Sequence, residues 1–180
     1  GGHFRAFGGP PVPIQLAPPS PQTHWTELET RPHPGDIKPI WEPARFGWAF
    51  TLGRAWRASG DESYPAAFWR YFETFQAENR PFFGENWTSG QEVGLRLIAL
   101  TFAGAVFANA EQTTPPRLAA LAAAIGLHAS RIVPTLAYAR AQNNNHLLSE
   151  AAALYTAGLA LPDHPQAENW RKIGVKWLKW

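Results

Sequence analysis

The sequence predicts an all-α fold built from helical hairpins. From about Ile40 to the end of the chain, apolar residues recur with a helical period, and turn signals separate the periodic stretches at short intervals. No segment shows a convincing period-two alternation of the kind a half-buried β-strand requires. Successive hairpins of similar length are typical of a toroid or solenoid.

The opening segment, residues 1–35, is predicted to be an irregular, proline-rich arm. Eight of the 17 prolines fall within the first 34 residues, where the missing N–H group and the ring clash of proline block helix formation. Apolar side chains in the same segment are numerous enough to anchor it against the rest of the protein. These side chains are Phe4, Phe7, Ile14, Leu16 and Trp25.

Six helices are predicted after the arm, at about 41–58, 63–79, 89–108, 115–138, 146–158 and 166–180. Gly60 and Asp61 end the first helix, and aromatic residues at helical spacing give the second one apolar face. Prolines in the first turn open the fourth helix, which should bend near Pro134. The last helix is still amphipathic at Trp180, so we expect the chain to stop before the helical region is complete.

The composition excludes several classes of function. The absence of cysteine excludes disulfides, thiolate chemistry and a cysteine zinc site. The net charge is +2 and the basic residues are scattered singly, which does not indicate a nucleic-acid surface. No run of 18 apolar residues suggests a membrane span. An isoelectric point of about 9.2 is compatible with an anionic partner such as an acidic polysaccharide.

The most unusual local sequence is the polar stretch Gln142-Asn143-Asn144-Asn145-His146-Leu147-Leu148-Ser149-Glu150. In the simpler interpretation, the asparagines break one helix and cap the next. In the functional interpretation, their side-chain N–H groups and the positive end of the following helix bind a carboxylate. His146 and Glu150 then share one helix face at i and i+4, a spacing that could also ligate a metal, although two ligands are a weak signal.

A second cluster, within residues 85–96, contains Trp87, Glu92 and Arg96. Glu92 and Arg96 are spaced i, i+4, as in an exposed helix ion pair worth a few tenths of a kcal/mol. Trp87 is either a stacking platform for a sugar ring or a core residue, and core is the more frequent role for tryptophan. In the functional interpretation all three side chains bind substrate.

A third cluster, residues 36–46, interleaves polar and aromatic side chains at a predicted helix start. Glu42 is expected in the first turn, where the helix dipole favours an acid. Arg45 either pairs with Glu42 or faces a groove, and Trp41 precedes both. The nine tryptophans of the chain are compatible with a carbohydrate cleft, but packed helices also need large apolar side chains.

Taken in order, the three clusters resemble the helical region of the heparinase II/III-like family. The matching elements are Asp36-x-Lys38-x-x-Trp41-Glu42-x-x-Arg45, Asn86-Trp87-x-Ser89-x-x-Glu92-x-x-x-Arg96 and Asn144-Asn145-His146-Leu147-x-x-Glu150-Ala151. Each motif is short, but the three together have family-like spacing. They favour the functional interpretation of the asparagines, and the resemblance covers about residues 36–180.

The resemblance implies a fold and a reaction. Family members combine an incomplete (α/α) toroid with a following β-sandwich region, so this chain would supply the opening hairpins. They are polysaccharide lyases that cleave beside a uronic acid by β-elimination. That chemistry must offset charge on the substrate carboxylate, remove the C5 proton and protonate the leaving oxygen at C4.

The resemblance also implies residue roles. Asn144 or Asn145 would neutralise the substrate carboxylate, and His146 would line the same cleft. The expected substrate-binding residues are Trp41, Glu42, Arg45, Trp87, Glu92, Arg96 and Glu150. The catalytic tyrosine and a further histidine are expected beyond the sixth helix, because neither Tyr138 nor Tyr155 matches the family's tyrosine motif.

The expected partners are an acidic polysaccharide, heparan sulfate-like or alginate-like, and the C-terminal portion of the same polypeptide. Neither nucleic acid nor a membrane is expected as a partner. No metal or other cofactor is expected in this region, although a structural metal is compatible with the C-terminal portion. Because such enzymes meet polymers outside the cytoplasm, the expected location is periplasmic or secreted.

Two other interpretations remain open at the level of sequence. A glycoside hydrolase on the same toroid needs two carboxylates about 5–9.5 Å apart, for which Glu42, Glu92 and Glu150 are candidates. That interpretation leaves the asparagines unexplained. A non-catalytic carbohydrate-binding or scaffolding module is favoured if the asparagines only cap a helix and the backbone satisfies their side chains. The chain by itself is expected to be incomplete as an enzyme.

Overall fold

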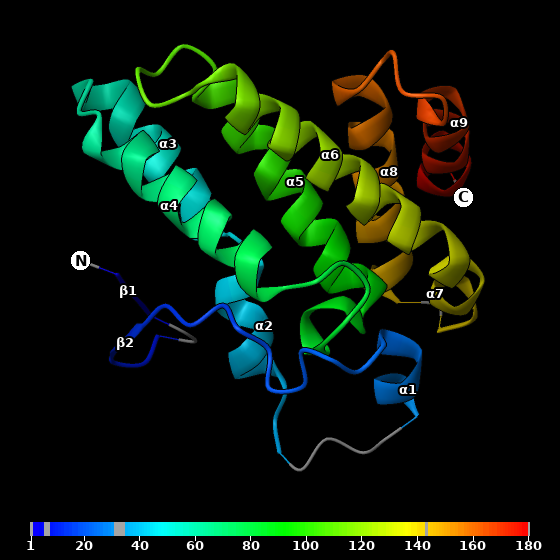
Figure 1. The fold of residues 1–180 in the computed structure, drawn as a ribbon. Coiled ribbons are helices and arrows are strands. Elements are labelled where there is room, and N and C mark those ends of the chain that lie inside the picture. The colour runs from blue at the N-terminus through cyan, green and yellow to red at the C-terminus, as the bar shows by residue number, and fades with distance from the viewer. Residues whose placement is uncertain (1, 6–7, 31–34, 143, 180) are drawn as a thin grey trace.

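The computed structural model describes residues 2–5, 8–30, 35–142 and 144–179, and it is dominated by helices (Figure 1). The helices after the arm are α2 (Lys38–Ala44), α3 (Trp48–Ser59), α4 (Ser63–Glu78), α5 (Gly90–Val106), α6 (Pro115–Ile132), α7 (Leu136–Gln142), α8 (Asn145–Ala160) and α9 (Ala167–Leu178). Two 3₁₀ turns, η1 (Glu85–Trp87) and η2 (Val133–Thr135), precede α5 and α7.

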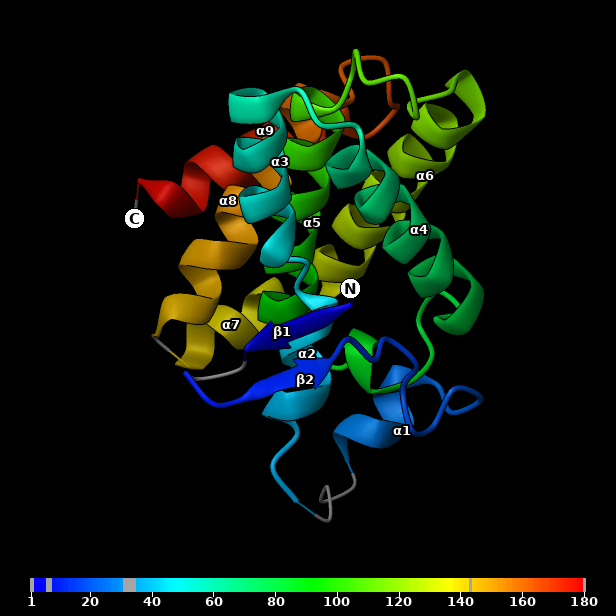
Figure 2. The ribbon, with the colours of Figure 1, turned by 90° about the vertical axis from the view of Figure 1, so that its left-hand side faces the viewer.

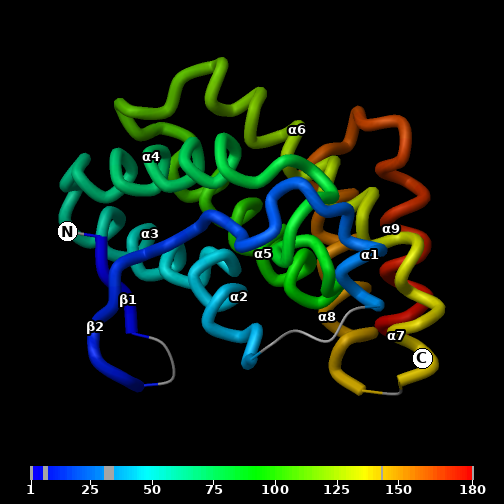
Figure 3. The backbone as a smooth tube through the Cα atoms, turned by 60° about the horizontal axis from the view of Figure 1, so that its bottom comes forward, coloured from blue at the N-terminus to red at the C-terminus, as the bar shows by residue number. Residues whose placement is uncertain are grey.

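The long helices pack side by side as the hairpins α3–α4, α5–α6 and α8–α9 (Figures 1 and 3). Helix α5 contacts α3, α6 and α8, so it lies at the centre of the assembly. Its sequence explains this position, because apolar and small residues surround the helix on nearly every side. The hydrophobic core is continuous from α2 to α9.

The arm crosses one end of this helical assembly (Figures 1 and 2). It contains two short antiparallel strands, β1 (His3–Arg5) and β2 (Pro11–Pro13), and a short helix, α1 (Trp25–Glu29). The sequence did not predict these elements, because three or five residues are too few to carry a periodic signal. Phe7, one of the predicted anchors, lies outside the described residues, as do positions 31–34.

Backbone and side-chain hydrogen bonds attach the arm to the loop between α4 and α5. The carbonyl of Leu16 accepts from the side-chain amides of Asn79 (2.9 Å) and Asn86 (3.1 Å). Further along, the N–H of Trp25 donates to the carbonyl of Phe82 at 2.9 Å. Leu16 is buried, so the arm is tied to the core at a fixed point.

The first predicted helix, about 41–58, is wrong as a single element, because the chain breaks between α2 and α3. Phe46 adopts φ 58°, a left-handed conformation that costs an L-residue about 1–2 kcal/mol. Its ring is fully buried against Trp48 and Phe75, and that burial offsets the strain. Since α2 begins at Lys38, Glu42 lies in the second turn rather than the first, and the expected dipole contact is not made.

The other predicted helices are confirmed to within a few residues. Gly60 ends α3 with φ 68°, as a left-handed C-cap requires. The side chains of Ser89 and Thr114 cap α5 and α6 by accepting backbone N–H groups. The predicted bend near Pro134 is the 3₁₀ turn η2.

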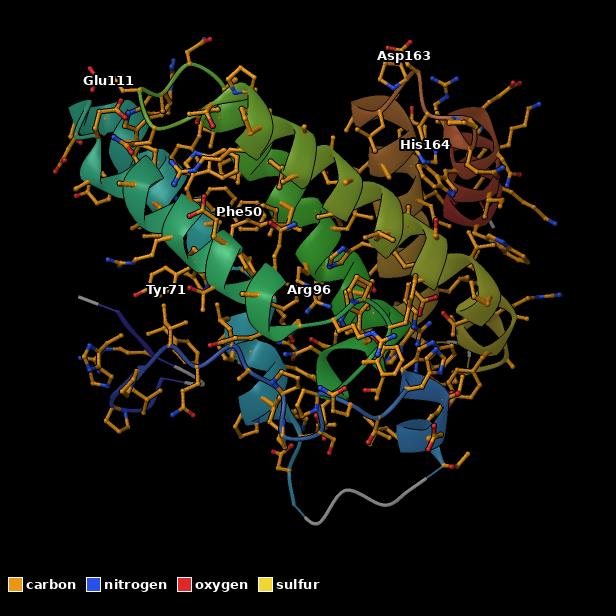
Figure 4. The ribbon with its side chains drawn as sticks, in the orientation of Figure 1. Phe50, Tyr71, Arg96, Glu111, Asp163 and His164 are labelled. Carbon is orange, nitrogen blue, oxygen red and sulfur yellow. The ribbon has the colours of Figure 1, made fainter. Side chains whose placement is uncertain are left out.

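Arg96 lies at the point where several elements meet, and Figure 4 shows it below the centre of the helices. Its side chain is 1% exposed. The guanidinium donates to the carbonyls of Ala44 (3.0 Å) and Asn86 (2.6 Å) and to Nε2 of His128 (2.8 Å). Arg96 therefore links α5 to α2, to η1 and to α6.

The surroundings of Arg96 and His128 determine the protonation state of each side chain. Burial lowers the pKa of Arg96 to about 9, so the guanidinium still carries its charge at neutral pH. Burial and the neighbouring charge of Arg96 lower the pKa of His128 to about 3, so its imidazole is neutral. The Nε2 atom can then accept from Arg96 while Nδ1 donates to the carbonyl of Ala124 at 2.7 Å.

One described stretch, Pro115–Gln142, is long and apolar enough by composition to cross a membrane, although core helices pass the same test. Of its most apolar 18-residue segment, 44% is buried inside the protein. The stretch is also interrupted by η2, and α6 packs against α5 and α8. These contacts are those of a core helix.

Replacing Arg96 tests whether this buried guanidinium holds the fold together. Arg96→Met should lower the free energy of unfolding by roughly 3 kcal/mol or more, because two buried carbonyls and an imidazole lose their donor. Urea unfolding followed by tryptophan fluorescence measures the change. The control is Arg54→Met on the exposed side of α3, which should change stability by less than about 0.5 kcal/mol. A loss below about 1 kcal/mol for Arg96→Met would contradict the assignment.

Candidate functional site

A cleft of about 490 Å³ opens where the arm crosses the ends of the helices. Figure 3, which brings this end forward, shows α1, α2, α7 and α8 meeting there. The lining residues come from the arm, α2, the η1 segment, η2, α7 and α8. They are Pro19, Ser20, Leu28, Glu29, Ile37, Trp41, Glu85, Thr88, Ser89, Gly90, Thr135, Tyr138, Gln142, His146 and Glu150.

The predicted asparagine element lies at the start of α8, between Gln142 and His146, which line the cleft, but neither Asn144 nor Asn145 is itself a lining residue. Asn144 is the N-cap, and its Oδ1 accepts the backbone N–H of His146 at 2.9 Å. Its Nδ2 donates to the side-chain oxygen of Gln142 at 3.2 Å. Asn145 is exposed and makes no side-chain hydrogen bond within the described part of the chain, while Asn143 lies outside that part. The capping interpretation is therefore correct for Asn144, but it uses only the oxygen of that side chain.

His146 and Glu150 lie one turn apart on α8 and both line the cleft, as their spacing predicts. His146 is half-buried, and its ring makes no hydrogen bond to a described residue. Glu150 is 2% exposed and accepts weakly from the hydroxyl of Thr135 at 3.5 Å. Burial raises the pKa of Glu150 to about 7, and the nearby charge of Arg131 opposes this shift.

The η1 segment and the residues that follow it form a second wall of the cleft. The four consecutive carbonyls of residues 85–88 all accept hydrogen bonds from side chains on other elements. The donors are Trp41 Nε1 to Glu85 O (2.8 Å), Arg96 Nη2 to Asn86 O (2.6 Å), Arg131 Nε to Trp87 O (2.9 Å) and Arg131 Nη2 to Thr88 O (2.8 Å). The wall is thus held from behind by α2, α5 and α6.

The second predicted cluster does not face the cleft. Trp87, Glu92 and Arg96 are 2%, 4% and 1% exposed and none of them lines the cleft, so the geometry gives no support to their expected role in substrate binding. Trp87 is a core residue that packs against His128. Arg96 donates to carbonyls rather than forming a surface ion pair with Glu92. The three residues have the spacing of the motif, but in the structure their side chains contact other parts of the fold.

The third cluster divides between the cleft and the interior. Trp41 lines the cleft. Arg45 pairs with Glu42 and, through two nitrogens, with Glu92, one of them Nη2 to Oε1 at 2.8 Å. The hydrogen bond to Glu92 is the main reason that the pKa of Arg45 is raised. Of the two alternatives for Arg45, pairing with Glu42 is therefore correct, and neither Glu42 nor Arg45 lines the cleft.

Sequence reasoning missed Arg131, Thr135 and Tyr138. Arg131 is 1% exposed and lies directly behind the cleft, while Thr135 and Tyr138 line it. A signal was present, because a single buried histidine and a single arginine, His128 and Arg131, interrupt the apolar face of an alanine-rich helix. Buried polar residues at such positions need specific partners.

The titratable groups on the wall of the cleft are acidic, apart from His146 and Tyr138. Glu29, Glu85 and Glu150 line it, and none of the lysines or arginines that the structure describes does. The carboxylate of Glu85 is already used, because Oε2 accepts the backbone N–H of Ser20 at 3.0 Å. Among the described residues, no group of three or more His, Asp or Glu side chains is placed to hold a metal ion.

A comparison with models of known protein families identifies the family of the chain. Residues 21–180 match the model described as Heparinase II/III N-terminus. The chain belongs to the heparinase II/III family. The matched residues contain all three motifs and also Leu28 and Glu29 of the arm, which line the cleft, but not Pro19 and Ser20.

Two curated proteins similar to this family member are heparin-sulfate lyases. The one from Bacteroides thetaiotaomicron is 29% identical over 141 residues, covering 74% of this chain and 19% of the relative. The one from Bacteroides stercoris is 28% identical over 155 residues, covering 75% of this chain and 23% of the relative. The chain therefore spans about a fifth of the length of the curated relatives it matches.

Solved structures confirm the predicted fold class. A heparinase III structure matches with a TM-score of 0.70 and 23% identity, over 84% of this chain and 26% of that one. A heparan sulfate lyase from Pedobacter heparinus matches with a TM-score of 0.75 and 21% identity, over 98% of this chain and 26% of that one. The all-α chain of this family member thus has the fold of part of an incomplete (α/α) toroid.

The buried Glu150 generates a prediction for the pH dependence of stability. Burial raises the pKa of its carboxyl to about 7 in the folded protein, above the ordinary value of 4.5. The stability that the neutral carboxyl contributes is therefore fully present below about pH 4.5 and is lost as the pH rises to 7. Glu150→Gln should remove this loss. Relative to the unsubstituted chain, it should gain roughly 1–3 kcal/mol in free energy of unfolding between pH 4.5 and pH 8.

Urea unfolding at several pH values measures this gain. The matched control is Glu78→Gln, an exposed carboxyl at the end of α4, which should leave the pH profile unchanged. If Glu150→Gln and Glu78→Gln show the same pH dependence, Glu150 is not held neutral by burial.

Proposed function

We propose that the intact protein is a polysaccharide lyase that cleaves heparan sulfate-like glycans beside a uronic acid by β-elimination. The observation that carries the proposal is the Asn144-Asn145-His146 element at the edge of a cleft, in a chain whose family relatives are named heparin-sulfate lyases. In this proposal the chain supplies part of the substrate cleft, and the remainder of the protein supplies the rest of the catalytic groups.

The local geometry supports a role for the asparagines beyond capping. The cap bond of Asn144 fixes Oδ1 toward the backbone, and this leaves Nδ2 on the outer side, where it bonds only the side chain of Gln142. The amide of Asn145 has no side-chain partner within the described chain. A neutral amide can donate to a carboxylate whose charge grows in the transition state, without a full charge of its own to desolvate.

The reaction assigns a limited task to each residue. A base removes the proton at C5, the bond between C4 and the glycosidic oxygen breaks, the electron pair forms a C4–C5 double bond, and the leaving oxygen takes a proton. Asn144 or Asn145 would stabilise the carboxylate during this change. His146 would bind the same sugar from the next position along α8, because it lines the cleft and its ring is not engaged elsewhere in the described chain.

The geometry gives less support to a glycoside hydrolase. Two of its three candidate carboxylates, Glu42 and Glu92, are bound to Arg45 and do not line the cleft. The capping role of Asn144 favours a non-catalytic binding module. However, the backbone bonds only Oδ1 of Asn144, and no other side-chain atom of Asn144 or Asn145 is bonded to described backbone. For a polymer substrate of this kind, we propose a periplasmic or secreted location.

The lyase proposal is tested by incubating the intact protein with heparan sulfate, heparin, alginate and other uronate polysaccharides. The ultraviolet absorbance of the unsaturated product should rise with heparan sulfate, and Asn144→Ala/Asn145→Ala should lower kcat by about 10²–10³-fold. A rise with alginate alone would replace the proposed substrate class. Reducing ends without the chromophore would indicate a hydrolase, and neither product would indicate a binding module.

Separate variants distinguish the amide from the helix cap. Asn144→Ser keeps a capping oxygen but removes the amide N–H groups, so it should keep the stability of the protein while losing activity if Asn144 binds the carboxylate. Asn145→Ala removes an amide that has no capping role. The control is Asn169→Ala, an exposed asparagine on α9. Full activity in both Asn144→Ser and Asn145→Ala would contradict the proposed role of the asparagines.

A further inference from the structure

We propose that Arg131 is a positioning residue that clamps helix α1 of the arm and the 87–88 backbone to the helical core, and so sets the shape of the cleft. The inference rests on the proposed function only for the claim that the cleft binds a glycan. Arg131 itself is 1% exposed and does not line the cleft. It acts through residues that do.

The first contact is with the wall that follows η1. The Nε and Nη2 groups of Arg131 donate to the carbonyls of Trp87 (2.9 Å) and Thr88 (2.8 Å). Thr88 lines the cleft, and Ser89 and Gly90 follow it along the same wall. Two hydrogen bonds from one planar guanidinium fix both the position and the direction of this backbone.

The second contact is with the arm. The guanidinium carbon lies 3.4 Å from the ring centroid of Trp25, a stacked cation–π arrangement that gains strength because the cation is buried. Trp25 is the first residue of α1, and Leu28 and Glu29 at the other end of this helix line the cleft. The charge of Glu29 also favours the charged form of Arg131. The position of α1 therefore depends on Arg131.

The third contact is with the opposite side of the cleft. The Nη1 group donates to the hydroxyl of Thr135 at 3.4 Å, and that hydroxyl lies 3.5 Å from Oε2 of Glu150. Both Thr135 and Glu150 line the cleft. One side chain thus reaches, directly or through one residue, the arm, the 87–88 backbone and α8.

The chemistry of arginine suits this task better than that of lysine. Lysine has a single nitrogen and no planar face, so it cannot donate along these three directions and stack on Trp25 at once. Burial lowers the pKa of Arg131 to about 10, which leaves the group charged at neutral pH. Loss of the guanidinium should therefore loosen α1 and the 87–88 backbone together.

The experiment compares amide hydrogen exchange in the intact protein for Arg131→Lys and Trp25→Leu with a matched control. The control is Arg117→Lys, on the same helix α6 but only half-buried and paired with Glu73 far from the cleft. Exchange over residues 20–30 should become at least about 10-fold faster in both test variants, exchange over 84–90 should do so in Arg131→Lys, and exchange in α3 and α9 should stay unchanged.

Kinetics with heparan sulfate provide a readout that a purely structural role would not move. Arg131→Lys should raise KM by about 10-fold or more with a smaller change in kcat, since the walls of the cleft lose their spacing while the asparagine element stays in place. Unchanged exchange in the arm would overturn the proposal whatever the activity. Faster exchange confined to these segments in a protein that cleaves no glycan would support the clamp and count against the lyase proposal instead. Should Arg131→Lys fail to fold, Trp25→Leu decides, because it removes only the arm contact.

Discussion

The structure depends on the need to satisfy four consecutive backbone carbonyls in the η1 segment. Residues 85–88 lie between helices rather than within a long one, so their carbonyls lack the regular partners of an α-helix. Side chains from α2, α5 and α6 donate to all four carbonyls, and the N–H and hydroxyl of Thr88 also donate to the carbonyl of Glu85. Because an unsatisfied buried carbonyl costs about 1–3 kcal/mol, these contacts fix where the three helices lie relative to one another.

This solution places two buried arginines, Arg96 and Arg131, next to the cleft without giving either a carboxylate hydrogen-bond partner among the described residues. Carbonyl dipoles, aromatic faces and a neutral imidazole stabilise the charges. Holding the wall in place and, in the proposed lyase, binding the substrate are therefore tasks of different residues. The arginines on α5 and α6 hold the wall. Asn144, Asn145 and His146, at the start of α8, have side chains that make few hydrogen bonds within the described chain.

Helix positions could be predicted well because they follow from local patterns: periodicity, proline positions and capping residues all act within a few residues. The failures came where distant contacts override local preference. Phe46 takes a left-handed conformation because its ring enters the core, and the short elements of the arm exist because they pack against the loop between α4 and α5. Similarly, the role of Arg96 could not be read from its i, i+4 spacing to Glu92, since its partners are about 10, 32 and 52 residues away in sequence.

The sequence by itself determined the all-α class, most helix boundaries, the family resemblance and the presence of an Asn-Asn-His element at a helix start. Only the tertiary structure decided which motif residues face the cleft. It sends Trp87, Glu92 and Arg96 inward, leaves Trp41 and His146 partly exposed at the cleft, and places the buried Glu150 against its wall. The physical reason is that a motif specifies side chains along one element, whereas burial depends on which other elements pack against it, and that is set by contacts between residues far apart in the chain.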